Sequence, residues 1–169
     1  MTTKKHANNP ELTGEHAWGD AGQIILFFIF LLVWIADSFF LDYSILRLEF
    51  LSLAVKLIVA AVIFILSGSL ASNGLKIVFG EKREKPEVIK KGPFSFVRHP
   101  VYLAAILLYL GFLVISFSLL SALVWLVIIT FYFCIARYEE RILTKEFGKE
   151  YLQYKREVPM LFPLRLRYK

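Results

Sequence analysis

Four long apolar runs, separated by polar segments, dominate the chain. They occupy residues 23–41, 50–71, 101–117 and 119–136. Each run is close to the ~20 residues that a helix needs to cross the hydrocarbon core of a bilayer. A strand or open loop in contact with lipid would leave its backbone polar groups without partners, so each run is predicted to be helical. The pattern predicts an all-α integral membrane protein with four transmembrane helices.

The last two runs are divided only by the Ser-Phe-Ser segment 116–118. A single helix through both runs would greatly overshoot a bilayer, so a tight helical hairpin is expected. Segment 73–79 is weakly apolar, and it can either extend the second helix or re-enter the membrane surface, so a fifth span stays open.

Residues 137–158 show the spacing of an amphipathic helix that lies near the membrane surface. Ile142, Leu143, Phe147 and Tyr151 recur at roughly helical intervals. Gly148 is a weak point that can divide this helix into two pieces, and Pro159 is expected to end it. The element could form a lid over a pocket or rest on lipid headgroups.

Two charged residues interrupt the apolar runs. Asp37 lies late in the first run and is expected at the membrane interface. Lys56 lies near the start of the second run and is expected to extend its ammonium group to the same interface. An ion pair between these two residues is the alternative.

The composition agrees with a membrane protein. Of the 169 residues, 57% are hydrophobic and 20% are charged, which is more apolar and less charged than a soluble domain of this size. The net charge is +6, and the basic residues cluster between the apolar runs. This placement favours an anionic membrane surface over nucleic acid as the partner. The single cysteine, Cys134, cannot form an internal disulfide, and no metal-binding spacing is present.

Segments rich in lysine and arginine alternate along the chain with segments that have few or none. Four spans, which place successive segments on opposite sides of the membrane, would give this pattern. The N-terminal tail has two, loop 42–49 has one, segment 72–98 has seven, the hairpin tip has none, and the chain from residue 137 has nine. By the positive-inside rule, both termini and the middle loop are expected on the cytoplasmic side. We expect a polar tail over residues 1–22 and one membrane domain over residues 23–169.

One candidate site precedes the third helix, in the stretch KKGPFSFVRHPVY at residues 90–102. Pro100 suits the first turn of a helix, where its missing N–H costs nothing. Arg98 and His99 would then lie at a helix N-terminus, which favours anions, and Tyr102 would share a helix face with His99. Alternatively, these side chains only anchor the helix end at the headgroups.

A second polar stretch, RYEERILTKEFGKE, begins at Arg137. Arg98 precedes Phe117 by 19 residues, and Glu139 follows Ser118 by 21, so a hairpin places both stretches at nearly the same depth. We therefore expect Arg98, His99 and Tyr102 to face Arg137, Glu139 and Glu140. Adjacent carboxylates at a membrane edge require partners. They can form a structural ion pair with arginine, or they can line a polar pocket that is open to water.

Together, GPFSFVRHPVY at 92–102 and RYEERILTKEFGKEYLQYKREVP at 137–159 resemble the isoprenylcysteine carboxyl methyltransferases and the related membrane phospholipid methyltransferases. The similarity covers about residues 81–163. It implies S-adenosyl-L-methionine as the methyl donor and a lipid-like or prenylated acceptor, with a phospholipid amine or a thiol as alternatives.

The resemblance also implies site residues. Glu139 would contact the cofactor, with Glu140 as the register alternative, and Arg137 is the nearest arginine that could hold the acceptor, although its offset does not match the family's. Arg137 and Glu140 are accordingly the candidate catalytic residues. Ala104 stands where the family commonly has glycine. The other candidate cofactor contacts are Ile89 with the rest of segment 86–89, Phe94, Arg98, His99, Pro100, Val101 and Tyr102.

Three questions stay open at this point. We expect His99 to be mainly a binding residue, although it could act as a general base for an amine or thiol acceptor. Sterol-reductase-type enzymes, which use a reduced nicotinamide cofactor, resemble these methyltransferases in their C-terminal halves. A membrane protein without enzymatic activity, whose polar cluster is only structural, is the third reading.

Overall fold

The computed structural model describes residues 17–80 and 87–163, and this part of the chain is helical without any strand. One isolated antiparallel β-bridge joins Ile45 to Ser118 in this part of the chain. The elements in chain order are α1 (Ala17–Ile35), the π-helix η2 (Ala36–Leu41), α2 (Leu53–Phe79), the 3-10 helix η3 (Gly92–Ser95), α3 (Pro100–Ser116), α4 (Leu119–Phe147) and α5 (Lys149–Glu157).

Each of the four predicted apolar runs corresponds to a helical part of the chain: residues 23–41 to α1 and η2, 50–71 to α2, 101–117 to α3 and 119–136 to α4. Ala21–Leu41, Leu53–Phe79 and Leu119–Phe147 are long and apolar enough to cross a membrane, and Pro100–Ser116 is a shorter apolar helix. Segment 73–79 extends α2, so of its two possible roles the structure shows the first. The chain is an integral membrane protein built on a four-helix bundle.

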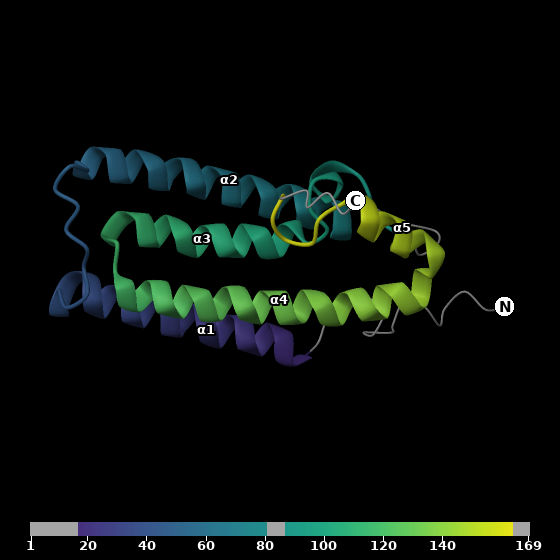
Figure 1. The fold of residues 1–169 in the computed structure, drawn as a ribbon, viewed down its shortest axis with the longest axis horizontal. Helices are drawn as coiled ribbons and strands as arrows, with labels where there is room; N and C mark the ends of the chain where they lie inside the picture. Colours follow the sequence, from purple (N-terminus) through teal and green to yellow (C-terminus); the bar gives the residue numbers. More distant parts are fainter. Residues whose placement is uncertain (1–16, 81–86, 164–169) are drawn as a thin grey trace.

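The helices are arranged in two side-by-side pairs, α2 with α3 and α1 with α4 (Figure 1). The start of α1, the end of α2, η3 and α5 lie at one end of the bundle, while loop 42–52 and the α3–α4 turn lie at the other (Figure 1). Helix α1 begins at Ala17, earlier than the predicted apolar run, and residues 1–16 of the expected polar tail lie outside the described residues.

Small residues allow α2 and α3 to approach closely. The buried positions of α2 are Ala60, Ser67 and Gly74, which recur every seven residues along one face. The Ser67 hydroxyl donates a hydrogen bond of 2.7 Å to the carbonyl of Ala104 in α3. In lipid, where water does not drive helices together, close packing of small residues and interhelical hydrogen bonds hold such pairs. Ala104 is itself buried within this interface.

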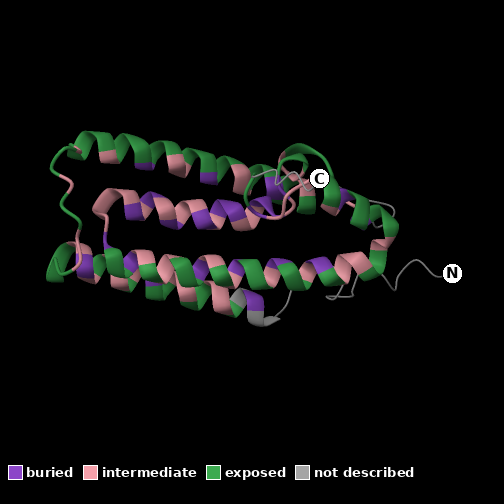
Figure 2. Ribbon diagram, viewed as in Figure 1, coloured by how far each residue is buried: buried purple, intermediate pink, exposed green. Residues whose placement is uncertain are grey.

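The apolar core lies between α1, α3 and α4, and the outer faces of the helices are exposed (Figure 2). Exposed side chains on these faces are mostly large and apolar, for example Leu32 and Ile65, each about 70% exposed. This pattern suits helices that face lipid rather than water. The buried core consists of Phe30, Ile106, Tyr109, Leu113, Ile128, Tyr132 and Leu161.

A sharp reversal joins α3 to α4, as predicted. Phe117 adopts a left-handed conformation (φ 54°), and the Ser118 hydroxyl caps α4 by accepting a hydrogen bond from the N–H of Ser121 at 3.1 Å. Asp37, in η2, is buried beside this turn and accepts a hydrogen bond of 2.6 Å from the same Ser118 hydroxyl. The N–H groups of Tyr43 and Ser44 and the hydroxyl of Ser44 also donate to Asp37.

One sequence-based prediction about the helices needs correction. Residues 137–147 do not belong to a separate surface helix, because α4 continues without interruption to Phe147 and only α5 turns away (Figure 1). Gly148 does divide the helix, with a positive φ of 53°. Asp37 lies beside the α3–α4 turn at one end of the bundle, where an interface position was expected, and it is buried there. Lys56 lies over the ring of Phe117 in the same turn, with 5.3 Å between its ammonium nitrogen and the ring centroid, and the described ranges show no ion pair between Lys56 and Asp37.

Candidate active site

An ion pair between Arg98 and Glu140 joins the two ends of the α3–α4 hairpin. The Nε and Nη2 atoms of Arg98 each lie 2.6 Å from Oε1 of Glu140. Both side chains are nearly buried, with 8% and 6% of their surfaces exposed. Arg98 precedes the first residue of α3, and Glu140 lies one turn beyond buried Ala136 in α4, so both point between the helices.

His99 and Tyr102 face the second carboxylate, Glu139. The two rings are stacked, with centroids 5.5 Å apart and planes within 4° of parallel. The Tyr102 hydroxyl donates a hydrogen bond to Glu139, and Nδ1 of His99 lies 3.4 Å from the same carboxylate. The predicted meeting of the Arg-His-Pro-x-Tyr stretch and the glutamate pair is therefore confirmed, including the shared helix face of His99 and Tyr102.

The C-terminal segment covers this cluster. The ammonium group of Lys155 in α5 lies 3.0 Å from Oε2 of Glu140. The backbone N–H groups of Arg98 and His99 donate to the carbonyls of Pro159 and Met160, at 2.9 and 3.1 Å. Leu161 then inserts into the apolar core. The polar cluster is thus enclosed by α5 and residues 158–161 on the side away from the membrane-spanning part of the bundle.

Sequence reasoning did not find the contributions of Lys155 and the segment after α5. Arg98 also donates to the carbonyls of Lys155 and Val158, so its guanidinium group links α3, α4 and the C-terminal segment. The two basic residues in the last turn of α5 are Lys155 and Arg156, and the sequence does not show which of them contacts the cluster. The spacing of Tyr151 and Tyr154, both buried, was the available signal, because it shows which face of α5 turns toward the cluster.

The environment of His99 favours its protonated form. Burial by itself lowers the pKa of His99, but the hydrogen bonds and negative charges of Glu139 and Glu140 outweigh this effect and raise it. Nε2 of His99 lies 3.5 Å from Oε1 of Glu140 without a hydrogen bond to any described residue. In the protonated ring this nitrogen carries a hydrogen and can still donate a hydrogen bond to a ligand.

The remaining candidates for cofactor binding lie before α3 and in its first turn. Pro100 and Val101 pack against Gly74 of α2, where an added Cβ would lie 3.0 Å from the Val101 side chain. The carbonyl of Phe94 accepts a hydrogen bond of 2.6 Å from the Tyr154 hydroxyl. Ile89 is half-buried just before η3, and Pro86, at the start of the predicted segment 86–89, lies outside the described residues.

Arg137 was expected to face the cluster, but it points away from it. Its side chain is exposed and lies over the ring of Phe133, with 5.2 Å from the guanidinium carbon to the ring centroid. The inward face of α4 carries Tyr132, Ala136 and Glu140, four residues apart, and Arg137 falls on the neighbouring outward face. Within the described ranges 17–80 and 87–163, no ion pair joins Arg137 to either glutamate, and no group of residues could hold a metal ion.

Comparison with known proteins identifies the family. Residues 50–150, which include all of α2, α3 and α4, match the family model described as phospholipid methyltransferase. The chain belongs to the phospholipid methyltransferase family. No curated protein and no solved structure matches.

Membership of the phospholipid methyltransferase family makes this chain a membrane methyltransferase, in agreement with the resemblance seen in the sequence. The matched region contains Arg98, His99, Tyr102 and both glutamates, but it ends before Lys155 and the segment that covers the cluster. The ion pair of Arg98 with Glu140 therefore lies within the region that matches the family. Lys155 and residues 158–161, which pack over this pair, lie outside that region.

Proposed function

We propose that the protein transfers a methyl group from S-adenosyl-L-methionine to a lipid-like acceptor at the cytoplasmic face of a membrane. The observation that carries this proposal is the convergence of Arg98, His99, Tyr102 and Glu139 at one end of an apolar helical bundle. This end of the bundle lies between the water phase, which would supply a charged nucleoside, and the bilayer, which would supply an apolar acceptor.

The chemistry of the cluster suits the proposed cofactor. The amino acid end of S-adenosyl-L-methionine carries an ammonium group and a carboxylate. Glu139 and the Tyr102 hydroxyl are partners for the ammonium group, and protonated His99, with its unpaired Nε2, is a partner for the carboxylate. Phe94, Pro100, Val101 and Ile89 are the apolar residues that the sequence marks as further cofactor contacts. We propose that these residues, with Arg98 in support, form the cofactor site.

The two glutamates differ in how fully they are engaged. Glu140 contacts Arg98, Lys155 and His99 and has only 6% of its side chain exposed. Glu139 contacts Tyr102 and His99 and has 17% exposed. We therefore propose Glu139 as the ligand contact. Glu140, which the sequence marks as a candidate catalytic residue, would act by holding Arg98, His99 and Lys155 in place.

Methyl transfer asks the protein mainly to position two reactants. When bound, the cofactor supplies a methyl group already activated on a sulfonium centre. Orienting an acceptor against such a group can contribute ~7–11 kcal/mol to the rate. A protonated His99 between two carboxylates cannot accept a proton, so its proposed role is binding rather than general base catalysis.

The acceptor is proposed to be lipid-like, a prenylated cysteine or a phospholipid amine, with a thiol as a further alternative. The exposed apolar faces of α1, α2 and α4 would leave such a molecule in contact with lipid on its way to the site. Arg137, on the outward face of α4, is the proposed contact for an anionic acceptor group. The excess of lysine and arginine at this end of the bundle supports a cytoplasmic location for the site and both termini.

Calorimetric titration of the purified chain with S-adenosylhomocysteine tests the proposal. We expect binding to the wild type, a loss of at least tenfold in affinity for Glu139→Gln, which removes a charge-assisted contact of about 1.5–3 kcal/mol, and no change for Glu146→Gln, an exposed residue of the same helix. Loss of turnover in His99→Ala with unchanged affinity would overturn the binding role of His99.

The same preparation separates the rival functions. Binding of a reduced nicotinamide cofactor in place of S-adenosylhomocysteine would favour a reductase. If neither ligand binds, and Glu139→Gln changes only the stability of the protein, the cluster is structural. Methylation assays with a prenylcysteine, phosphatidylethanolamine and a small thiol then identify the acceptor.

A further inference from the structure

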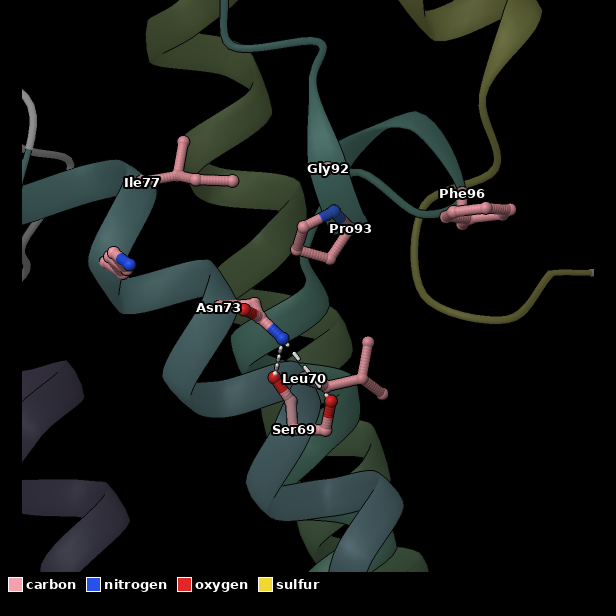
Figure 3. Close-up of a pocket in the computed structure, with 8 residues that line it drawn as sticks. Ser69, Leu70, Asn73, Ile77, Gly92, Pro93 and Phe96 are labelled. Carbon is pink, nitrogen blue, oxygen red and sulfur yellow. Dashed lines mark hydrogen bonds between the residues drawn. The ribbon is translucent and has the colours of Figure 1, made fainter.

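A groove separate from the Arg98–Glu140 cluster runs between α2 and η3. Its volume is about 360 Å³. Figure 3 shows the α2 side chains on one side and the turn that carries Gly92 and Pro93 on the other. The lining residues are Ser69, Leu70, Asn73, Lys76, Ile77, Gly92, Pro93 and Phe96.

The first turn of α3 separates this groove from the polar cluster. Gly74 of α2 meets Pro100 and Val101 closely enough that an added Cβ would lie 3.6 and 3.0 Å from their side chains. The α2 residues that line the groove lie on the neighbouring face of the helix, beside this contact. The contact of Gly74 with Pro100 and Val101 therefore lies between the groove and His99, which directly precedes Pro100.

The groove combines an apolar wall with one cation. Leu70 and the 71% exposed ring of Phe96 belong to the apolar wall. Lys76 lies in the last turn of α2 and forms no ion pair with any residue in the described ranges 17–80 and 87–163. Asn73 donates both to the carbonyl and to the hydroxyl oxygen of Ser69, at 2.9 and 3.3 Å, which leaves the hydroxyl hydrogen of Ser69 free to donate (Figure 3).

These features match an anionic phospholipid. The groove lies at the basic end of a membrane-spanning helix, where the last turn also exposes apolar side chains such as Phe79. Basic pockets between membrane helices on this side of a bilayer hold anionic headgroups. We propose that the groove binds an anionic phospholipid of the bilayer as a bound, non-reacting lipid. Its phosphate lies at Lys76 and the Ser69 hydroxyl, and an acyl chain lies along Leu70 and Phe96.

Native mass spectrometry of the full chain in detergent, with phosphatidylglycerol and phosphatidylcholine as probes, tests this site. We expect Lys76→Gln to weaken phosphatidylglycerol binding by about fivefold, the effect of one lysine near an anionic headgroup, and to leave phosphatidylcholine binding unchanged. Ser69→Phe, at an exposed position, fills the groove and should abolish the bound lipid. Lys145→Gln is the matched control, because Lys145 is an exposed lysine in the last turn of α4.

Each other outcome counts against the site. Equal effects of Lys76→Gln and Lys145→Gln would show a diffuse attraction of the basic surface for anionic lipid. Unchanged lipid binding by Ser69→Phe would show that the groove is not the site. If Lys76→Gln only raises the KM for the methyl acceptor, the groove belongs to the substrate. Titration of all three variants with S-adenosylhomocysteine keeps this test independent of the proposed function, since we expect their affinity for that ligand to be unchanged.

Discussion

Arg98 and Glu140 lie 42 residues apart in the chain and form a nearly buried ion pair with nitrogen–oxygen distances of 2.6 Å. The pair closes the end of the α3–α4 hairpin that lies opposite the turn. Because Arg98 also donates to the carbonyls of Lys155 and Val158, the same guanidinium group holds the C-terminal segment against the hairpin. Disruption of this pair should therefore affect both the fold and the site.

The first prediction concerns the cost of leaving Glu140 without Arg98. Breaking a buried pair by removing one partner typically costs 3–5 kcal/mol, and Lys155 still contacts Glu140, so we expect Arg98→Met to lower the free energy of unfolding by about 3 kcal/mol. The measurement is unfolding by sodium dodecyl sulfate in mixed micelles.

Two further variants control the experiment with Arg98. Arg137→Met removes an exposed arginine of the same hairpin and should leave the free energy of unfolding nearly unchanged. The double variant Arg98→Met, Glu140→Met removes both charges and should recover much of the loss. A loss below about 1 kcal/mol for Arg98→Met would mean that Lys155 alone compensates Glu140.

The second prediction follows from the raised pKa of His99. The folded chain holds the imidazole proton more tightly than the unfolded chain, whose reference pKa is 6.5. The resulting stabilisation is complete below that value and is lost as the pH rises through the higher pKa of the folded state. We expect the free energy of unfolding of the wild type, relative to His99→Gln, to fall across this range. A difference that does not depend on pH would contradict the protonated state of His99.

The third prediction concerns Asp37 at the far end of the bundle. Replacement by alanine leaves the N–H groups of Tyr43 and Ser44 and the hydroxyls of Ser44 and Ser118 without their acceptor. We expect Asp37→Ala to lower the free energy of unfolding by about 3 kcal/mol, since hydrogen bonds to a charged group contribute about 1.5–3 kcal/mol each and water can replace some of them.

Asp42→Ala is the control for Asp37. Asp42 is half-exposed and pairs with exposed Arg47, and a surface pair of this kind contributes about 0–1 kcal/mol. If the two aspartate variants unfold alike, the hydrogen bonds to Asp37 do not stabilise the turn.

The fourth prediction tests the close approach of α2 and α3. A Cβ at Gly111 would overlap the ring of Phe64, so Gly111→Ala should destabilise the fold by about 1–3 kcal/mol through overpacking. At Gly68, by contrast, an added Cβ meets nothing within 4 Å, and Gly68→Ala should stabilise α2 by about 0.5–1 kcal/mol. The measurement is thermal unfolding followed by circular dichroism. Similar shifts for both variants would show that α2 and α3 are less tightly packed than described.

The sequence by itself determined the helices, the hairpin and the meeting of its two polar ends. Apolar runs of bilayer length must be helical, and a reversal near Phe117 must return the chain to its starting depth, so the approach of Arg98 to the glutamate pair follows from counting residues. The break at Gly148 was equally readable, because glycine is the residue that adopts a positive φ at little cost.

Only the tertiary structure decided which side chains the cluster contains. The outward direction of Arg137, the burial of Asp37 beside Ser118, and the arrival of Lys155 and Leu161 over the hairpin all depend on how whole helices are rotated and where the chain leads after Gly148. Spacing along a sequence fixes the positions within one helix relative to each other. It does not fix the rotation of that helix against its neighbours, which packing and the satisfaction of buried charges determine together.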